Sequence, residues 1–190
     1  MGVSELVRAE LARHDWTALS CACGDSAEHV PLLFETLLTA ESPHDAFGYG
    51  LSGHVEDSCF IAECTGPAIG VILAALAGEV SPAVRSEFLE TLLSAAYGSG
   101  YDDASPTARA HDEYRAMVQE GFWLLMQAGL TGSAQDAETM ADLCEYYDLG
   151  DHKSAHYQAL LRERVRAKTK RRAARRQQGR APVLERDGDS

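Results

Sequence analysis

The chain has 190 residues, and its 17 Lys and Arg against 29 Asp and Glu give a net charge of −12. With 45% hydrophobic residues it is too apolar for a disordered chain, and it is long enough to bury one ordinary core. Its apolar runs are too short to span a membrane, and its N-terminal residues lack the pattern of a secretory signal. We therefore expect a cytoplasmic protein with reduced cysteines.

The charge is divided unevenly along the chain. Residues 1–150 contain five basic and 24 acidic residues, whereas residues 151–190 contain twelve basic and five acidic residues. We expect an acidic helical domain over 1–150, a connecting helix over 151–161 and a basic, flexible tail over 162–190.

The composition favours helices. Ala and Leu, which are strong helix formers, number 50, whereas the β-branched Val and Ile number 13. No segment alternates between apolar and polar residues in the way that a hairpin of strands requires. The sequence therefore predicts an all-α domain.

The predicted helices follow one another along the whole acidic domain. A short helix over 4–14 comes first, as an N-terminal cap. Apolar residues then recur at i, i+3, i+4 and i+7, which predicts helices over 30–37, 69–76, 84–96, 114–128 and 140–147. A serine followed by a proline marks a helix start at three places, because serine caps a helix and proline suits its first position. These pairs are Ser42-Pro43, Ser81-Pro82 and Ser105-Pro106.

The helical segments suggest an internal repeat. Pro31 aligns with Pro67 at an offset of 36 residues, and Ser42-Pro43 aligns with Ser81-Pro82 at an offset of 39. Each unit would be a helix that starts with proline, a short turn and a second helix that starts with Ser-Pro. A third, degenerate unit would pair a long helix over 106–128 with a helix over 134–148.

The unit length and the x-Pro-x-Leu-Leu opening resemble the HEAT-like repeat family over residues 26–100. This resemblance implies an α-solenoid, that is, a stack of antiparallel helical hairpins that binds protein partners, with the basic C-terminal helix or tail at its end. Most members of the family have no catalytic residues, although a subset that resembles bilin lyases acts on tetrapyrroles.

Cys21, Cys23 and His29 form the cluster most similar to a metal site, because thiolates and imidazoles are good zinc ligands. Structural zinc sites usually have two separated ligand pairs, however, and Cys-x-Cys is tighter than the common spacing. A fourth ligand would have to come from another helix, and the candidates are Cys59, Cys64 and His54. The alternative is a turn with small, partly buried cysteines, and we predict no bound metal and no other cofactor.

Catalytic motifs are not evident, and we predict no enzyme activity and no catalytic residue. Cys144 could serve as a nucleophile with His111 as a distant base, but its place on an apolar helix face favours core packing. His152 and His156 have the i, i+4 spacing of a metalloprotease helix, but Lys153 stands where such a site requires Glu.

Two charged regions are candidates for binding. The acidic and aromatic residues near the predicted turns would receive a basic protein surface, and they are Asp102, Asp103, Glu145, Tyr146 and Asp148. The basic run would bind nucleic acid or another polyanion without sequence preference, or the protein's own acidic domain. It comprises Arg162, Arg164, Arg166, Lys168, Lys170, Arg171, Arg172, Arg175, Arg176 and Arg180.

These patterns favour a non-enzymatic protein-interaction module, such as an adaptor or an immunity or inhibitor protein that acts against a basic partner. The alternative is a nucleic-acid-associated protein that binds through its basic tail. We expect no membrane partner, because no apolar face accompanies the basic charges.

Overall fold

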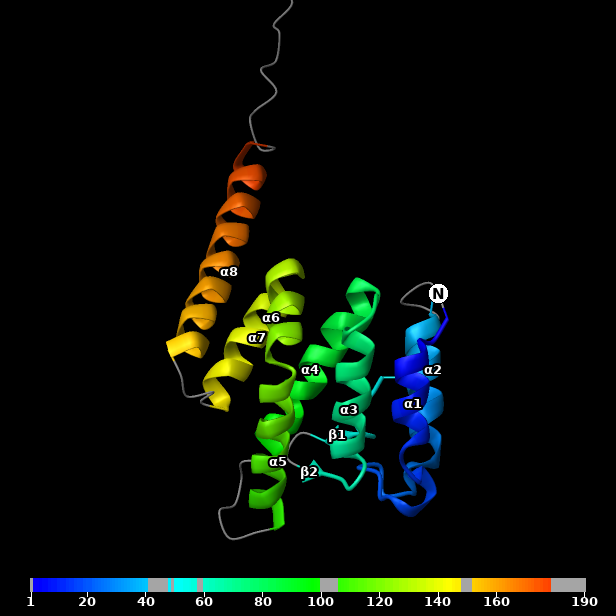
Figure 1. Cartoon of the computed structure of the whole chain (residues 1–190). Helices are drawn as coiled ribbons and strands as arrows, with labels where there is room; N and C mark the ends of the chain where they lie inside the picture. The colour runs from blue at the N-terminus through cyan, green and yellow to red at the C-terminus, as the bar shows by residue number, and fades with distance from the viewer. Residues whose placement is uncertain are drawn as a thin grey trace, which may run out of the picture.

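The computed structural model describes residues 2–40, 48, 50–57, 60–99, 106–147 and 152–178. Within these ranges the chain forms eight α-helices and one short hairpin (Figure 1), so the all-α fold class is confirmed. The helices are α1 (Glu5–Ala12), α2 (Val30–Thr39), α3 (Thr65–Leu76), α4 (Pro82–Ser99), α5 (Pro106–Glu120), α6 (Phe122–Thr131), α7 (Ala134–Tyr146) and α8 (His152–Gln178). The hairpin pairs β1 (Glu56–Asp57) with β2 (Phe60–Ile61), and 3-10 turns occupy η1 (Trp16–Ala18) and η2 (Ala27–His29).

Several helix starts follow from local chemistry that the sequence shows. α4 begins at Pro82, and the Ser81 hydroxyl accepts a hydrogen bond from the Val84 amide. α1 is capped in the same way, because the Ser4 hydroxyl accepts from the Val7 amide. These bonds satisfy amides of the first turn, which have no partner inside the helix.

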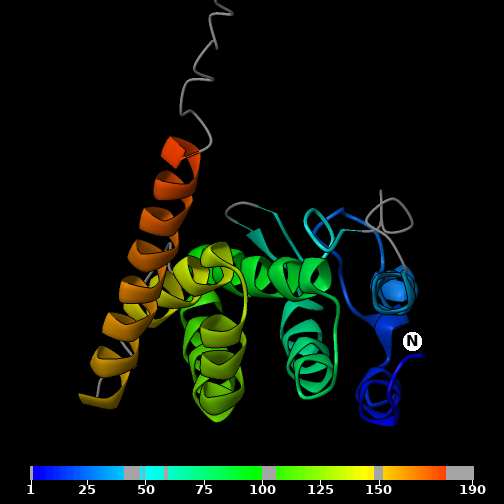
Figure 2. The ribbon, with the colours of Figure 1, turned by 90° about the horizontal axis from the view of Figure 1, so that it is seen from above.

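The helices stand in two rows with α8 at one end (Figure 2). One row holds α1, α3 and the α5–α6 pair, and the other holds α2, α4 and α7. α4 and α7 run in the same direction, because Ser86 contacts Asp136 near the start of both helices and Tyr97 stacks on Tyr146 near their ends. Buried apolar residues from α1 to α8 form one continuous core between the rows.

Contacts within one row join helices that are distant in the chain. Contacting residues of α4 and α7 lie 50 or 51 positions apart. In the same row, Phe34 of α2 packs against Phe88 of α4, with ring centroids 5.9 Å apart. The helix start predicted at Ser42-Pro43 lies outside the described residues.

The long helix predicted over 106–128 is divided at Gly121 into α5 and α6. The residue lies so close to α3 that a Cβ there would come within 2.7 Å of Leu73 Cδ2. Glycine at this position thus allows the α5–α6 junction to approach α3 closely, and its conformational freedom favours a break between the two helices.

α8 continues without a break through the boundary predicted between residues 161 and 162. Leu161 is fully buried and Val165 packs against the core, so the start of the basic run is docked on the domain. α8 runs antiparallel to α7, because Arg162 contacts Asp142 near the end of α7 whereas Lys168 contacts Gly132, before its start. Among the helices of the described ranges, none combines the length and the apolar character needed to cross a membrane.

Candidate metal centre and charged surfaces

Cys21 and Cys23 lie in a tight turn between η1 and η2. The Cys21 amide donates to the Asp25 carbonyl at 2.9 Å, and the Gly24 amide donates to the Cys21 carbonyl at 3.0 Å. Gly24 has a φ of 93°, a left-handed conformation that suits glycine, and it closes the turn. Both sulfurs therefore lie on one small, well-defined loop, with Cys21 buried and Cys23 exposed.

Two histidines from other segments reach the same place. His29 ends η2 and precedes the first residue of α2, while His54 lies in the loop before β1. The backbone ties the second loop to the cysteine turn, because the Ala22 amide donates to the His54 carbonyl at 2.8 Å. The two imidazole rings meet edge to face, with centroids 4.8 Å apart, and both are half-buried.

The four side chains converge on one point, and their ligand atoms all lie within 4.8 Å of one another. Cys21 Sγ is 3.5 Å from His29 Nε2 and 3.7 Å from His54 Nδ1, while Cys23 Sγ is 3.9 Å from His29 Nε2. The two nitrogens are 2.9 Å apart, and the sulfurs of the two free cysteines are 2.8 Å apart. Two sulfurs and two imidazole nitrogens are the donor set of a structural zinc site.

The surroundings of the cluster favour neutral forms of its groups. Burial, aided by the hydrogen bond with Cys23, raises the pKa of the Cys21 thiol to about 11. Burial and the neighbouring His29 lower the pKa of His54, which keeps this imidazole neutral and able to coordinate a cation. Cys64 lies beside the cluster rather than in it, because its thiol faces the His54 carbonyl at 3.6 Å.

The structure thus joins all three metal candidates of the sequence with His54, one of the three residues considered as a fourth ligand. Of the other two residues, Cys64 lies outside the cluster and Cys59 lies outside the described residues. The signal for His54 was its residue type alone, because 33 residues separate it from Cys21.

Cys144 is buried on α7, where burial raises the pKa of its thiol to about 11, so little thiolate would form near neutral pH. The side chain of His111, its suggested base, lies outside the described side chains.

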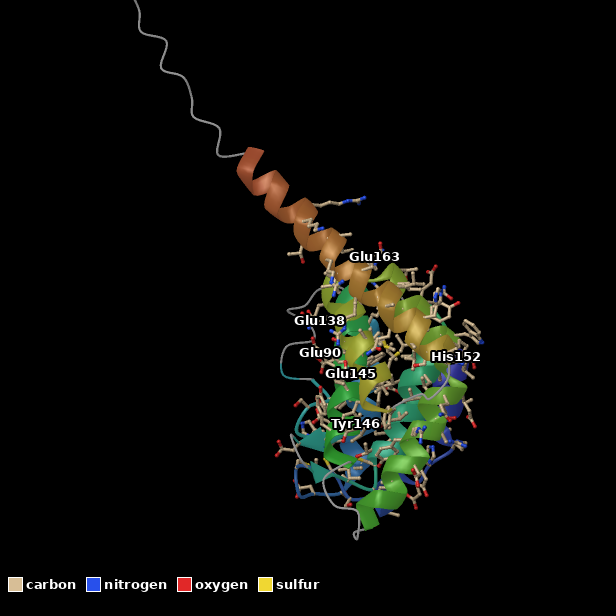
Figure 3. All side chains as sticks on the ribbon, turned by 90° about the vertical axis from the view of Figure 1, so that its left-hand side faces the viewer. Glu90, Glu138, Glu145, Tyr146, His152 and Glu163 are labelled. Atoms are coloured by element: carbon tan, nitrogen blue, oxygen red, sulfur yellow. The ribbon has the colours of Figure 1, made fainter. Side chains whose placement is uncertain are left out.

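An acidic face extends over α4 and α7. Glu138, Asp142 and Glu145 share one side of α7 at i, i+4 and i+7, and Glu90 is exposed on the adjacent α4. Figure 3 shows Glu90, Glu138, Glu145 and Tyr146 close together on the side that faces the viewer. Tyr97, which is 43% exposed, stacks on Tyr146 at its end. We call this set the α4–α7 acidic face, and its residues are Glu90, Tyr97, Glu138, Asp142, Glu145 and Tyr146.

Of the acidic and aromatic residues predicted to bind a protein, Glu145 and Tyr146 belong to this face. Asp102, Asp103 and Asp148 lie outside the described residues. Glu90, Glu138 and Asp142 also belong to the face, although they were not among the predicted residues. The i, i+4, i+7 spacing on α7 was a signal that could have found two of them, whereas Glu90 joins the face only through helix packing.

The basic residues of the predicted run fall into different environments. Arg162 forms ion pairs with Asp142 and Glu145 at 2.6 and 3.2 Å. Arg164 and Lys168 both donate to the Gly132 carbonyl, which follows the end of α6. The exposed members on α8 are Arg166, Lys170 and Arg171. Arg172, Arg175 and Arg176 lie on α8 with side chains that are not described, and Arg180 lies outside the described residues.

The family to which the chain belongs is not revealed by comparison, because no protein-family model, curated protein or solved structure gives a significant match to it.

Proposed function

We propose that the protein is a non-enzymatic module of HEAT-like helical repeats that binds a protein with a basic surface. Its binding element is the α4–α7 acidic face, and an adaptor or an inhibitor of a cationic protein would use such a face in the same way. The observation that carries the proposal is that this face already receives a basic helix, α8, through Arg162.

The contact of α8 with this face supports the proposal in detail. The Arg162 guanidinium reaches Asp142 and Glu145, which lie one helical turn apart on α7, and the amide of Gln158 also donates to Glu145. The two carboxylates keep the pKa of Arg162 raised although burial acts in the opposite direction. α7 can therefore hold a guanidinium between two acids, which is how acidic surfaces recognise arginine-rich partners.

Much of the face is exposed, including Glu145, whose side chain is 70% exposed although it contacts Arg162. Glu90, Glu138 and Glu145 are all exposed, and the ring pair of Tyr97 and Tyr146 offers aromatic surface beside them. Aromatic residues are enriched at the centres of protein interfaces, and surrounding acids would steer a basic partner toward them. These side chains project from two packed helices, α4 and α7, which belong to the same row (Figure 2).

Charge reversal tests this proposal. The triple variant Glu90→Lys, Glu138→Lys and Glu145→Lys is expected to lose a basic binding partner that the wild-type chain captures from lysate at physiological salt. The loss should be at least tenfold, because like charges would then oppose the partner across the interface. The measurement is quantitative pull-down followed by titration of the purified partner.

A matched control separates this effect from net charge. The variant Glu35→Lys, Glu113→Lys and Glu120→Lys makes the same charge change at exposed positions on α2 and α5. It should retain the partner. Equal loss in both variants, or a wild-type chain that captures no specific basic protein, would contradict the proposal.

The exposed Arg166, Lys170 and Arg171 of α8 support nucleic-acid binding as a second candidate function. Replacing the three with alanine is expected to reduce the slope of log affinity against log salt for a DNA duplex by about two to three, because each phosphate contact contributes about 0.9. The control is Arg8→Ala with Arg13→Ala in the acidic domain, which should leave the slope unchanged. An identical slope for wild type and the α8 variant would remove this candidate.

A further inference from the structure

We propose that Cys21, Cys23, His29 and His54 bind one Zn²⁺ ion in a closed, structural site that joins two loops of the protein. This site is independent of the acidic face, and it replaces our expectation from sequence that no metal is bound.

The donor set favours zinc over other common cations. Thiolate sulfurs bind soft or borderline ions, whereas Mg²⁺ and Ca²⁺ require oxygen ligands. Two thiolates with two imidazoles form one of the usual combinations in structural zinc sites. Cys23 is exposed at the rim of the cluster, so an ion can enter from solvent.

The distances suit a tetrahedral ion. With Zn–S near 2.3 Å and Zn–N near 2.0–2.1 Å, the edge between a sulfur and a nitrogen ligand is about 3.5 Å. Three of the four sulfur–nitrogen distances between these cysteines and histidines are 3.5, 3.7 and 3.9 Å, and the fourth, between Cys23 and His54, is within 4.8 Å. The edge between the two nitrogens should be about 3.3 Å, so the observed 2.9 Å requires an outward shift of a few tenths of an ångström.

The pair of sulfurs also needs an adjustment. They are 2.8 Å apart, and a tetrahedral edge between two sulfurs is about 3.8 Å. Because Cys23 is exposed at the rim of its turn, rotation of its side chain can provide this change without moving the buried Cys21. A shift of this exposed side chain, together with the small outward shift of the imidazoles, completes the site.

The backbone holds the ligands near one another from three segments. The cysteine turn is flanked by a bridge between Ser20 and Ser26, and the Ala22 amide ties it to the loop of His54. Ser20 is also tied to the start of α3, since its amide donates to the Glu63 carboxylate. The cluster is thus built into a hydrogen-bonded framework and does not depend on a chance approach of long side chains.

The number of ligands indicates what the ion does. Four protein ligands close a tetrahedral shell and leave no position for a water or substrate, so the ion would be structural rather than catalytic. It would join the connection between α1 and α2 to the connection between α2 and α3. A metal link between residues 33 positions apart removes chain entropy from the unfolded state, and binding free energy becomes folding free energy.

The experiment uses the full chain. The protein is stripped with a chelator under reducing conditions and titrated with Zn²⁺ or Co²⁺. We expect one metal ion per chain, release of about two protons per ion as both thiols ionise, and the visible bands of tetrahedral Co²⁺ with thiolate ligands. The melting temperature should rise with the free Zn²⁺ concentration, because the ion binds only the folded state.

Cys23→Ser provides the most direct test, because the Cys23 side chain is exposed and the substitution leaves no cavity in the core. It should weaken Zn²⁺ binding by at least about a hundredfold. Loss of a residue that only hydrogen-bonds to a metal ligand weakens the affinity by about 10- to 100-fold, and loss of a ligand itself should cost more. His54→Ala should have the same effect, while the controls Cys64→Ala and His152→Ala should bind as wild type does. Circular dichroism establishes that each variant is folded.

Three results would overturn the proposal. One is a wild-type chain that takes up no Zn²⁺ at micromolar concentrations, which would identify the cluster as a network of thiol and imidazole hydrogen bonds. Another is one ion for every two chains, which would place the ion between molecules. The third is a folded Cys23→Ser variant that binds Zn²⁺ with unchanged affinity.

Discussion

Replacing Asp136 with alanine is expected to lower the free energy of unfolding by about 3–5 kcal/mol. The side chain has no exposed surface, and its carboxylate accepts hydrogen bonds from the Ser133 amide, the Ser86 hydroxyl and the Arg85 guanidinium. The substitution removes the capping box of α7 and leaves the guanidinium without the carboxylate that compensates its partial burial. Urea denaturation followed by circular dichroism measures the change.

The same carboxylate makes stability depend on pH. Burial acts to raise the pKa of Asp136, but the hydrogen bonds from Ser86 and Ser133, together with the charge of Arg85, outweigh it and leave the pKa lowered. A lowered folded-state pKa stabilises the fold above the pKa of the unfolded chain, and this contribution is lost as the pH falls through the folded value. Wild type should therefore lose stability below about pH 4 more steeply than the alanine variant.

The control for this position is Glu138→Ala, two residues further along α7. Its side chain is exposed, so its removal should change stability by no more than about 0.5 kcal/mol. If the Asp136 variant were as stable as this control, the contact between the starts of α4 and α7 would not hold the two helices together.

Replacing Leu161 with alanine is expected to lower the free energy of unfolding by about 2–5 kcal/mol, the usual effect of truncating a fully buried leucine. The side chain lies in the core at the junction of α8 with α6 and α7, within reach of Gly129 and close to Met140. This result would show that α8 is a cooperative part of the folded domain. Thermal or urea unfolding measures it.

Leu32→Ala is the matched control, because this leucine is 58% exposed on α2. Its truncation should change stability by no more than about 0.5 kcal/mol. A Leu161 variant that unfolds like wild type would mean that α8 is detached in solution and that the basic run is free along its whole length.

Local chemistry in the sequence determined most of the helices. The excess of Ala and Leu predicted the all-α fold, and Ser81-Pro82 marked the start of α4 to the residue. These signals act over a few neighbouring positions, because a cap satisfies amides of its own first turn and an apolar stripe follows the helical period. For the same reason they can be read without knowledge of the tertiary structure.

The tertiary structure decided which helices lie side by side. Phe34 of α2 packs on Phe88 of α4, a contact that no short pattern in the sequence specifies. Proline and Ser-Pro signals mark where a helix starts, but they do not specify which helix it packs against. The break at Gly121 likewise depends on the close approach of Leu73 from another helix.

The residues of the candidate sites also fall into two groups, those that the sequence indicated and those that only the folded chain brought together. The sequence by itself placed Cys21, Cys23 and His29 within one stretch of nine residues, but an extended stretch of that length would span roughly 28 Å. The turn closed by the Ser20–Ser26 bridge brings the three side chains together. Only the folded chain brought His54 to them across 33 positions, and only the parallel packing of α4 and α7 joined Glu90 to Glu138 and Glu145. The physical reason is that residue types and short spacings are local properties, whereas a ligand set or a charged face is completed by segments that meet through core packing.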